Sequence, residues 1–250
     1  MMDAQRTVIV TGVAGGIGSA IGARVRAAGY RILGVDREPA DAAACDTLVR
    51  CDLGDFVSTH GGGAAILSEL RRELAGRPLH GIVHAAAQQI VGDLDAVTLL
   101  DFERTLAVNL LAPFEITRAF RDDLRQARGA VVHVGSVHSK LSKPGFALYA
   151  TSKAALSGLT RSLALELAPD VRVNEVSPAA TDTPMLRAGF GDRWRSSADA
   201  LAKAHPMRRL ASSAEVADAV AFLLSAQASF VTGAEIAVGG GVHARLHDPS

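Results

Sequence analysis

Short apolar runs alternate with longer amphipathic segments along the whole chain, and this alternation predicts the fold. Runs with few alternating polar positions, typical of strands covered on both faces, predict strands over residues 7–10, 31–35, 47–51, 81–85, 130–134, 171–176 and 235–238. Apolar residues at helical spacing predict helices over residues 16–28, 64–74, 99–128, 148–167 and 214–224, the third being one long helix or two joined helices. Because strands alternate with helices, the sequence predicts an α/β fold: a Rossmann-type, doubly wound parallel sheet of about seven strands with helices on both faces.

Nothing in the sequence divides the chain into separate domains. Its 250 residues fit one α/β domain, and they contain no Pro/Ser-rich linker, low-complexity tract or repeat. We therefore predict a single domain over residues 1–250. The longest irregular stretch, residues 184–206, contains Gly189, Gly191 and Trp194. Because it follows a strand end, where open α/β sheets bind ligands, we predict that it is a loop that closes over the substrate as a lid.

The composition is ordinary for a globular protein and argues against several classes of partner. It is 48% hydrophobic and 21% charged, with 26 acidic and 26 basic residues, so we expect no nucleic-acid or membrane partner. The two cysteines form no disulfide framework and the eight histidines are scattered, so we expect no metal site. The chain opens without a basic-then-apolar leader, and no run approaches the roughly 18 apolar residues of a membrane span, so we expect a cytoplasmic protein.

A glycine-rich turn, TGVAGGIG at residues 11–18, joins the first predicted strand to the first predicted helix. Glycine lets the backbone turn sharply and approach a pyrophosphate without a Cβ in the way. The helix N-terminus that follows offers free N–H groups and the positive end of a dipole. A strand before the turn and a helix after it are the context that the dinucleotide-binding fingerprint requires, so we predict that Gly12, Gly16, Ile17 and Gly18 contact a cofactor.

Two aspartates at later strand ends are candidates for binding the adenosine half of such a cofactor. Asp36 closes the second strand about twenty residues after the turn, where a carboxylate accepts hydrogen bonds from both ribose hydroxyls and repels a 2′-phosphate. This predicts NAD rather than NADP, a preference that the neighbouring Arg37 could weaken. Asp52, followed by Leu53, ends the third strand at a natural site for adenine. The alternative for each aspartate is a turn or helix cap.

A tyrosine and a lysine four residues apart carry the strongest candidate chemistry. Tyr149 and Lys153 follow Ser136 in the segment VGSVHSKLSKPGFALYATSK, and their i, i+4 spacing places them on one helix face. A free phenol has a pKa of about 10, and a fixed ammonium nearby is expected to lower that pKa toward the working range. A serine hydroxyl can hold a substrate oxygen against the phenol, so the three suit proton transfer to or from an alcohol or carbonyl. The alternative for the spacing alone is an exposed amphipathic turn.

The glycine turn, the Ser136, Tyr149 and Lys153 set and several further segments occur in an order that resembles the short-chain dehydrogenase/reductase family over nearly the whole chain. TGVAGGIG is similar to the family's TGxxxGxG turn, and Ser136, Tyr149 and Lys153 are similar to its catalytic serine and YxxxK. Asn109, in LAVNLLAPF, matches the family's mid-helix asparagine, and Thr183, in SPAATDTPM, matches its nicotinamide-binding threonine. FLLSAQASFVTGAEIAVGGG resembles the family's closing helix and last strand.

The resemblance implies a mechanism. Tyr149 acts as general acid/base, Lys153 lowers its pKa and binds the nicotinamide ribose, and Ser136 orients the substrate oxygen. Asn109 holds a water that relays protons to solvent. Hydride moves between nicotinamide C4 and the carbinol carbon of a secondary alcohol. The remaining implied cofactor-binding residues are Ala85, Ala86, Pro178, Thr181 and Thr183.

The chain departs from the family pattern at three places. The family's Asn-Asn-Ala-Gly after the fourth strand is His-Ala-Ala-Ala at residues 84–87, which weakens a structural hydrogen-bond network. His84 either replaces one of those hydrogen bonds or is a half-buried histidine with its own partners. The usual Pro-Gly is Pro178-Ala179, and the usual Asp-Gly-Gly is replaced by three glycines at residues 239–241. None of these changes removes a catalytic group.

The substrate is the least determined part of the sequence reading. We expect the pocket to include Gln89, His138, Phe146 and Met185. The first two resemble the pattern of 3-hydroxybutyrate dehydrogenases, in which a glutamine and a histidine help to hold a carboxylate. Phe146 stands where that pattern has a lysine, for which Lys140 or Lys143 could substitute. The C-terminal part also resembles bacterial 3α-hydroxysteroid dehydrogenases, and the alternative for His138 is a solvated loop histidine.

Two other functions stay open at this point. One is an NADPH-dependent ketoreductase of acyl-thioester chemistry, which would favour a basic residue in place of Asp36. The other is a dinucleotide-binding regulator without turnover, against which the complete catalytic set argues. Family members are commonly homotetramers or homodimers, and the segment ALSGLTRSLALEL is apolar on more than one face, as expected for a subunit contact.

Overall fold

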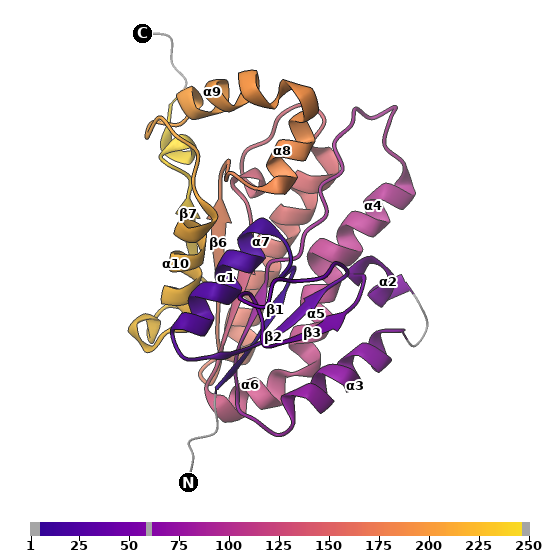
Figure 1. Ribbon diagram of the computed structural model, residues 1–250, viewed down its shortest axis with the longest axis vertical. Coiled ribbons are helices and arrows are strands. Elements are labelled where there is room, and N and C mark those ends of the chain that lie inside the picture. The colour runs from indigo at the N-terminus through magenta and orange to yellow at the C-terminus, as the bar shows by residue number, and fades with distance from the viewer. Residues whose placement is uncertain (1–5, 59–61, 247–250) are drawn as a thin grey trace.

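One parallel sheet lies at the centre of the computed structural model, which describes residues 6–58 and 62–246 (Figure 1). Its strands are β1 (Thr7–Thr11), β2 (Arg31–Asp36), β3 (Thr47–Arg50), β4 (Leu79–His84), β5 (Ala130–Val134), β6 (Arg172–Pro178) and β7 (Glu235–Val238). They lie in the order β3-β2-β1-β4-β5-β6-β7. Each observed strand matches its predicted range to within two residues, so the predicted seven-stranded Rossmann-type sheet is confirmed.

Helices connect the strands and cover both faces of the sheet. They are α1 (Gly16–Ala27), α2 (Leu53–Ser58), α3 (Gly62–Leu74), α4 (Leu99–Leu106), α5 (Ala112–Ala119), α6 (Arg121–Ala127), α7 (Ala147–Leu167), α8 (Pro184–Phe190), α9 (Trp194–Ala204) and α10 (Ser213–Leu224). No helix in the described part of the chain combines the length and apolar character needed to cross a membrane.

The strands bury both of their faces, which is why their sequences read as continuous apolar runs. Val8 and Val10 of β1 point to one face, where they pack with side chains of α1 and α10. Ile9 points to the other face, where the core includes Ile116 of α5 and Leu163 of α7. Figure 1 shows α1 and α10 side by side on the first face.

The order of the strands reverses beside β1. The chain runs outward from β1 through β2 to β3, and then returns past β1 to form β4. In such sheets the loops leaving β1 and β4 diverge at their carboxyl ends and open a crevice, which is where ligands bind.

The region predicted as one helix or two joined helices over residues 99–128 is broken more often than expected. A capping box between Thr98 and Asp101 starts α4, a π-helical turn at Ala107–Leu111 separates α4 from α5, and a further break at Phe120 starts α6. π-Helical turns inside helices are rare and occur mostly at functional sites. This turn contains Asn109.

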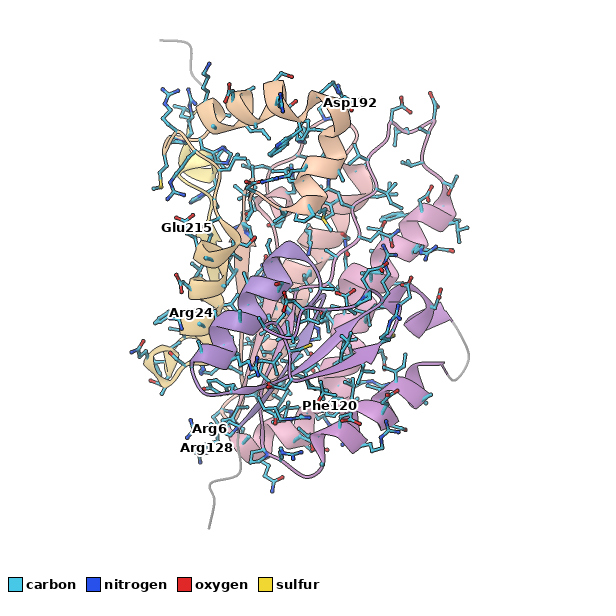
Figure 2. All side chains as sticks on the ribbon, in the orientation of Figure 1. Arg6, Arg24, Phe120, Arg128, Asp192 and Glu215 are labelled. Atoms are coloured by element: carbon cyan, nitrogen blue, oxygen red, sulfur yellow. The ribbon has the colours of Figure 1, made fainter. Side chains whose placement is uncertain are left out.

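The prediction of an irregular stretch over residues 184–206 was wrong. Thr183 caps α8 by accepting a hydrogen bond from the Leu186 N–H, and Pro184 takes the first helical position, where its missing N–H costs nothing. A short 3₁₀ turn at Gly191–Arg193 leads from α8 into α9 (Figure 2, Asp192). Of the glycines in this stretch, Gly189 lies inside α8 and Gly191 is its C-cap. The short helix α2 was also not predicted.

Candidate active site

The predicted glycine turn packs so closely that side chains would not fit. Gly12 has a φ of +70°, and a Cβ there would lie 2.6 Å from the backbone of Ala86. A Cβ on Gly18 would lie 1.9 Å from the Gly12 carbonyl oxygen, so Gly18 allows α1 to begin directly against the turn. A Cβ on Gly16 would lie 3.0 Å from the Pro184 ring. The turn after β1 therefore touches both the segment after β4 and the segment after β6.

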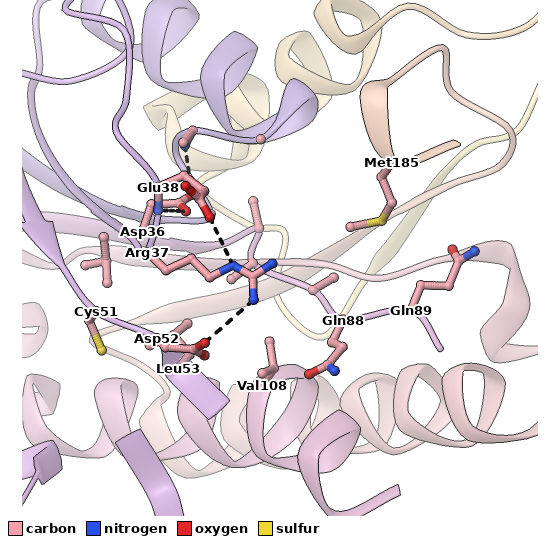
Figure 3. A pocket seen from close by; sticks show the side chains of 17 residues that line it. Asp36, Arg37, Glu38, Cys51, Asp52, Leu53, Gln88, Gln89, Val108 and Met185 are labelled. Carbon is pink, nitrogen blue, oxygen red and sulfur yellow. Dashed lines mark hydrogen bonds and ion pairs between the residues drawn. The ribbon is translucent and has the colours of Figure 1, made fainter. Parts of the chain in front are cut away.

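A cavity of about 430 Å³ opens at the carboxyl ends of β1, β2 and β4, at the predicted crevice. Figure 3 shows the residues that line it. The predicted cofactor-binding and substrate residues among them are Gly12, Asp36, Asp52, Leu53, Ala85, Ala86, Gln89 and Met185. Predicted site residues that lie far apart in the sequence, from Gly12 to Met185, thus share one cavity.

Asp36 lies at the end of β2 and faces the glycine turn. Its Oδ2 atom accepts a hydrogen bond of 2.9 Å from the Ala14 N–H, and its Oδ1 atom accepts one of 3.0 Å from the Glu38 N–H. These bonds fix the carboxylate at the rim of the cavity beside the turn. A carboxylate held there is well placed to accept hydrogen bonds from ribose hydroxyls.

Asp52 lines the cavity and also caps the start of a helix. Its Oδ1 atom accepts a hydrogen bond from the Gly54 N–H at the start of α2, which is a capping contact. Its Oδ2 atom lies 3.6 Å from Arg37 Nη1 and 3.4 Å from Arg104 Nη2. Figure 3 shows Arg37 extending along the cavity toward Asp52. The guanidinium group of Arg37 is therefore held beside Asp52 at the cavity wall.

Tyr149 and Lys153 are buried, which excludes the exposed amphipathic turn. Burial raises the pKa of Tyr149 to about 12, an effect that a hydrogen bond with the Ser136 hydroxyl only partly offsets. Burial lowers the pKa of Lys153 to about 8, while the Glu175 carboxylate acts in the opposite direction. The lysine Nζ atom donates to the Val134 carbonyl at 2.7 Å and lies 5.7 Å from the centre of the Tyr149 ring. The expected lowering of the phenol pKa is therefore not observed, because desolvation outweighs the hydrogen bond with Ser136.

Asn109 connects the loop after β4 to α7. Its Oδ1 atom accepts from the Gln88 N–H at 2.8 Å, and its Nδ2 group donates to the Gln88 carbonyl and to the Ser152 hydroxyl, each at 2.9 Å. Both amide N–H groups are thus used by the protein. The π-helical turn places this amide where it can hold Gln88, which lines the cavity.

The predicted nicotinamide-binding residues lie in and after β6. Pro178 is the last residue of β6, and the Thr181 hydroxyl donates to the Ala179 carbonyl. Thr183 is buried as the N-cap of α8, and its methyl group lies against the position of Gly16. The close approach of Thr183 to the glycine turn brings this segment to the same edge of the sheet.

Ile17, a predicted cofactor-binding residue at the start of α1, packs on the apolar core next to β1.

Three aromatic rings gather at the predicted substrate position. His138 stacks on Phe146 with ring centres 4.7 Å apart, and both rings lie about 6 Å from that of Tyr149, at 6.0 and 6.3 Å. His138 is half-buried, its Nδ1 atom donates to the Leu141 carbonyl, and burial lowers the pKa of its imidazole. Of the two candidate lysines, Lys143 lies over the Phe146 ring at 4.2 Å, whereas Lys140 is paired with Glu235.

His84 is fully buried and not half-buried as one reading held. Its Nε2 atom hydrogen-bonds the Thr117 hydroxyl of α5 at 3.0 Å. The histidine therefore ties β4 to α5, on the side of the sheet away from α1. Its ring also lies 5.3 Å from that of His133 on β5.

A buried carboxylate that was not predicted from the sequence lies beside this site. Glu175 lies in β6 and is 1% exposed. An acidic residue in the middle of a doubly covered strand is itself a signal, because a buried charge needs partners. Among the described residues, no group of three or more His, Cys, Asp or Glu side chains is arranged to hold a metal ion.

The chain is similar to known proteins in sequence and in structure. The family model described as enoyl-(acyl carrier protein) reductase matches residues 12–243. Protein FixR from Bradyrhizobium diazoefficiens is 36% identical to this chain, over 95% of this chain and 87% of that protein. Human dehydrogenase/reductase SDR family member 4 is 32% identical, over 97% and 89%.

Two solved structures share the fold closely. Ligand-free aldohexose dehydrogenase from Thermoplasma acidophilum has a TM-score of 0.89 at 29% identity and covers 98% of this chain, which covers 97% of that one. A protein described as an NAD(P)-dependent gluconate 5-dehydrogenase from Beutenbergia cavernae, with NADP bound, has a TM-score of 0.84 at 30% identity over 97% and 98%.

Proposed function

This chain belongs to the short-chain dehydrogenase/reductase family, and on that premise we propose that it is an NAD(H)-dependent oxidoreductase that interconverts a secondary alcohol and a ketone. The observation that carries the proposal is the buried cluster of Ser136, Tyr149 and Lys153. It lies at the same edge of the parallel sheet as the glycine turn. The proposal is tested by measuring turnover in both directions. NAD reduction is followed with hydroxy acids, diols and steroid alcohols, and NADH oxidation with the matching ketones. A protein that binds NADH but turns over none of these classes would contradict it.

The residues at the cavity fit a dinucleotide. The backbone of Gly12, Ala14 and Gly15 lines one side, and no Cβ can stand at Gly12 without meeting Ala86. The start of α1 offers free N–H groups for a pyrophosphate. Asp36 supplies a fixed carboxylate for a ribose, and Thr183 supports the segment that would contact a nicotinamide. A nicotinamide bound there supplies or accepts a hydride at C4.

Tyr149 provides the proton chemistry in this proposal. In ketone reduction its neutral phenol donates a proton to the carbonyl oxygen, and in alcohol oxidation the phenolate takes the hydroxyl proton. The Ser136 hydroxyl donates a hydrogen bond to the same oxygen. Lys153 holds a positive charge beside the phenol and stabilises its ionised form. The three groups are shielded from water, where each such contact is stronger than in solution.

The position of Asp36 favours NAD(H) over NADP(H), whereas Arg37 and the NADP-bound relative favour the alternative. We expect Asp36→Asn to lower the ratio of kcat/KM for NAD(H) to kcat/KM for NADP(H) by about 10-fold or more. The substitution removes the charge that repels a 2′-phosphate and weakens charge-assisted hydrogen bonds worth roughly 1.5–3 kcal/mol. Steady-state kinetics with both cofactors measures the ratio.

The amide oxygen at position 36 can still accept the hydrogen bond from the Ala14 N–H of the turn, whereas the bond from the Glu38 N–H is lost. Asp41→Asn is the matched control, because Asp41 caps a neighbouring turn outside the cavity. Wild-type preference for NADPH over NADH would overturn the cofactor assignment.

We also propose that α8 and α9, together residues 184–204, form the lid over the substrate. Met185 of α8 already lines the cavity. Trp194, the single tryptophan, begins α9 and packs against Phe190 at 6.2 Å, with the Arg187 guanidinium 5.7 Å from its ring. We expect saturable quenching of Trp194 emission when NADH and a ketone bind, because closure changes these contacts.

Trp194→Phe provides the blank for that titration, since no other tryptophan contributes. Emission that is the same with and without both ligands would count against closure by α8 and α9.

The proposed substrate is a small or medium secondary alcohol with a polar group near the reacting carbon. Gln89 in the cavity wall and His138 beside Tyr149 support this class, and Lys143 over Phe146 is the candidate cation for a carboxylate.

We further propose that the protein is a homotetramer or homodimer. Leu165 on the outer side of α7 is 82% exposed in the single chain, as expected for a face that a copy covers.

A further inference from the structure

Glu175 occupies a position where an isolated charge would be strongly unfavourable. It lies on β6 between Asn174 and Val176, and it is 1% exposed. Within residues 6–58 and 62–246, the buried class contains two Lys, Arg, Asp or Glu side chains, namely Lys153 and Glu175. A buried charge is stable only when it is paired or well hydrogen-bonded. Lys153 and Glu175 therefore each need partners inside the protein.

Helix α7 presents hydroxyl groups to this carboxylate from the two turns that follow Lys153. Ser157 and Thr160 follow Lys153 at i+4 and i+7, the spacing of one helical stripe. The Ser157 hydroxyl lies 2.8 Å from Glu175 Oε1, and the Thr160 hydroxyl lies 3.3 Å from Oε2. Ser177 on β6 adds a second hydroxyl at 2.8 Å from Oε1. Hydroxyl donors at these distances stabilise the ionised form of the carboxyl group.

Gly135 leaves space for the carboxylate directly beneath the catalytic cluster. A Cβ at Gly135 would lie 1.9 Å from Glu175 Oε1, so no larger residue fits there with the carboxylate in place. Gly135 precedes Ser136, and Val134 before it accepts the hydrogen bond from Lys153. The carboxylate and the ammonium thus lie against one short stretch of backbone.

The other titratable groups that face Glu175 come from the neighbouring strands. His133 of β5 is paired with Glu175 in the sheet register, and Glu235 of β7 is paired with it on the other side. Burial lowers the pKa of His133 to about 3, so this ring is neutral. Glu235 is paired with Lys140 near the surface. Glu175 is therefore the anion that faces Lys153 inside the protein.

We propose that Glu175 is a positioning residue for the reaction: its carboxylate keeps the Lys153 ammonium charged, so that the lysine can stabilise the Tyr149 phenolate. This inference rests on the proposed function of Tyr149 and Lys153. Burial, and to a smaller extent Glu235, raise the pKa of Glu175, and the Ser177 and Ser157 hydroxyls and Lys153 offset only part of that rise. The reciprocal effect of Glu175 is to raise the pKa of Lys153.

The direct test measures the Lys153 ammonium without any turnover. The chain has four lysines, and Lys140, Lys143 and Lys203 are exposed, so lysine labelled with ¹³C at Cε gives few NMR signals with three internal references. The signal that disappears in Lys153→Met is thereby assigned to Lys153. We expect Glu175→Gln to lower the pH midpoint of the Lys153 titration by about one pH unit or more, as expected when an opposite charge nearby is removed.

Glu235→Gln is the matched control, because it makes the same change one strand further along the same register. It should move the Lys140 signal and leave the Lys153 midpoint unchanged or slightly higher. An unchanged Lys153 midpoint in Glu175→Gln would overturn the proposal, whether or not the protein proves to be a dehydrogenase. The result of the titration therefore does not depend on whether the proposed function is correct.

A second readout uses the pH dependence of alcohol oxidation by the cofactor-saturated enzyme. In Glu175→Gln we expect kcat to fall and its rise to shift to higher pH, with KM little changed. Glu175→Asp keeps the charge, so it should restore part of kcat and part of the shift in the pH profile. A purely structural role would lower activity and stability without shifting the profile. If Glu175→Gln does not fold, Ser177→Ala gives the same test, because loss of a donor favours the protonated carboxyl and should lower the Lys153 midpoint in the same direction.

Discussion

Replacing Tyr149 with phenylalanine is expected to lower kcat in both directions by at least about 100-fold, the smaller end of what general acid–base catalysis contributes. The substitution removes one oxygen from a buried ring that packs against Phe146 and His138, so the apolar contacts remain. NADH binding, measured by fluorescence titration, should stay within a few-fold of wild type. The loss should therefore appear in the chemical step.

Tyr30→Phe is the matched control, since Tyr30 is the other tyrosine of the chain and lies beside His80 at the opposite edge of the sheet. Its turnover should equal that of wild type. Full turnover by Tyr149→Phe would contradict the assigned role of the phenol.

Replacing Lys153 with methionine is expected to affect alcohol oxidation more than ketone reduction. Burial already raises the pKa of Tyr149 to about 12, and without the ammonium that pKa rises further. Oxidation needs the phenolate, so its kcat should fall by about 100-fold or more and its rise should move to higher pH. Reduction uses the neutral phenol, so its proton donor persists and its loss should be smaller.

Kinetics in both directions across pH measure this difference. Lys203→Met, at an exposed position near the end of α9, serves as the control. Equal losses in both directions with an unshifted pH profile would show that Lys153 acts only by holding the cofactor.

The strands and the glycine turn could be predicted because both depend on local sequence. Strands buried on both faces read as continuous apolar runs, and Gly12 and Gly18 occupy positions where a Cβ would meet backbone atoms. Asp36 could be placed for the same reason, as the residue that ends β2. Parallel strands align these ends at one edge of the sheet, so the spacing along the chain was enough.

Features that depend on tertiary environment were predicted poorly. Helical capping by Thr183 and Pro184 turned an apparent loop into α8, and the π-helical turn around Asn109 has no periodic signature. The i, i+4 spacing showed that Tyr149 and Lys153 meet, but the burial that sets both pKa values comes from the packing of α7 on the sheet. Glu175 was missed because its partners come from α7 and β6 together.

The most direct test of the central claim is isotope transfer from NADH that carries deuterium on the reactive face of nicotinamide C4. The cofactor is incubated with wild-type protein and panels of keto acids, hydroxyketones and steroid ketones, and the products are analysed by mass spectrometry. We predict deuterium on the carbinol carbon of at least one product with wild type, and strongly reduced transfer with Tyr149→Phe at equal NADH occupancy. Saturable NADH binding without transfer to any ketone would contradict the account and favour a dinucleotide-binding regulator.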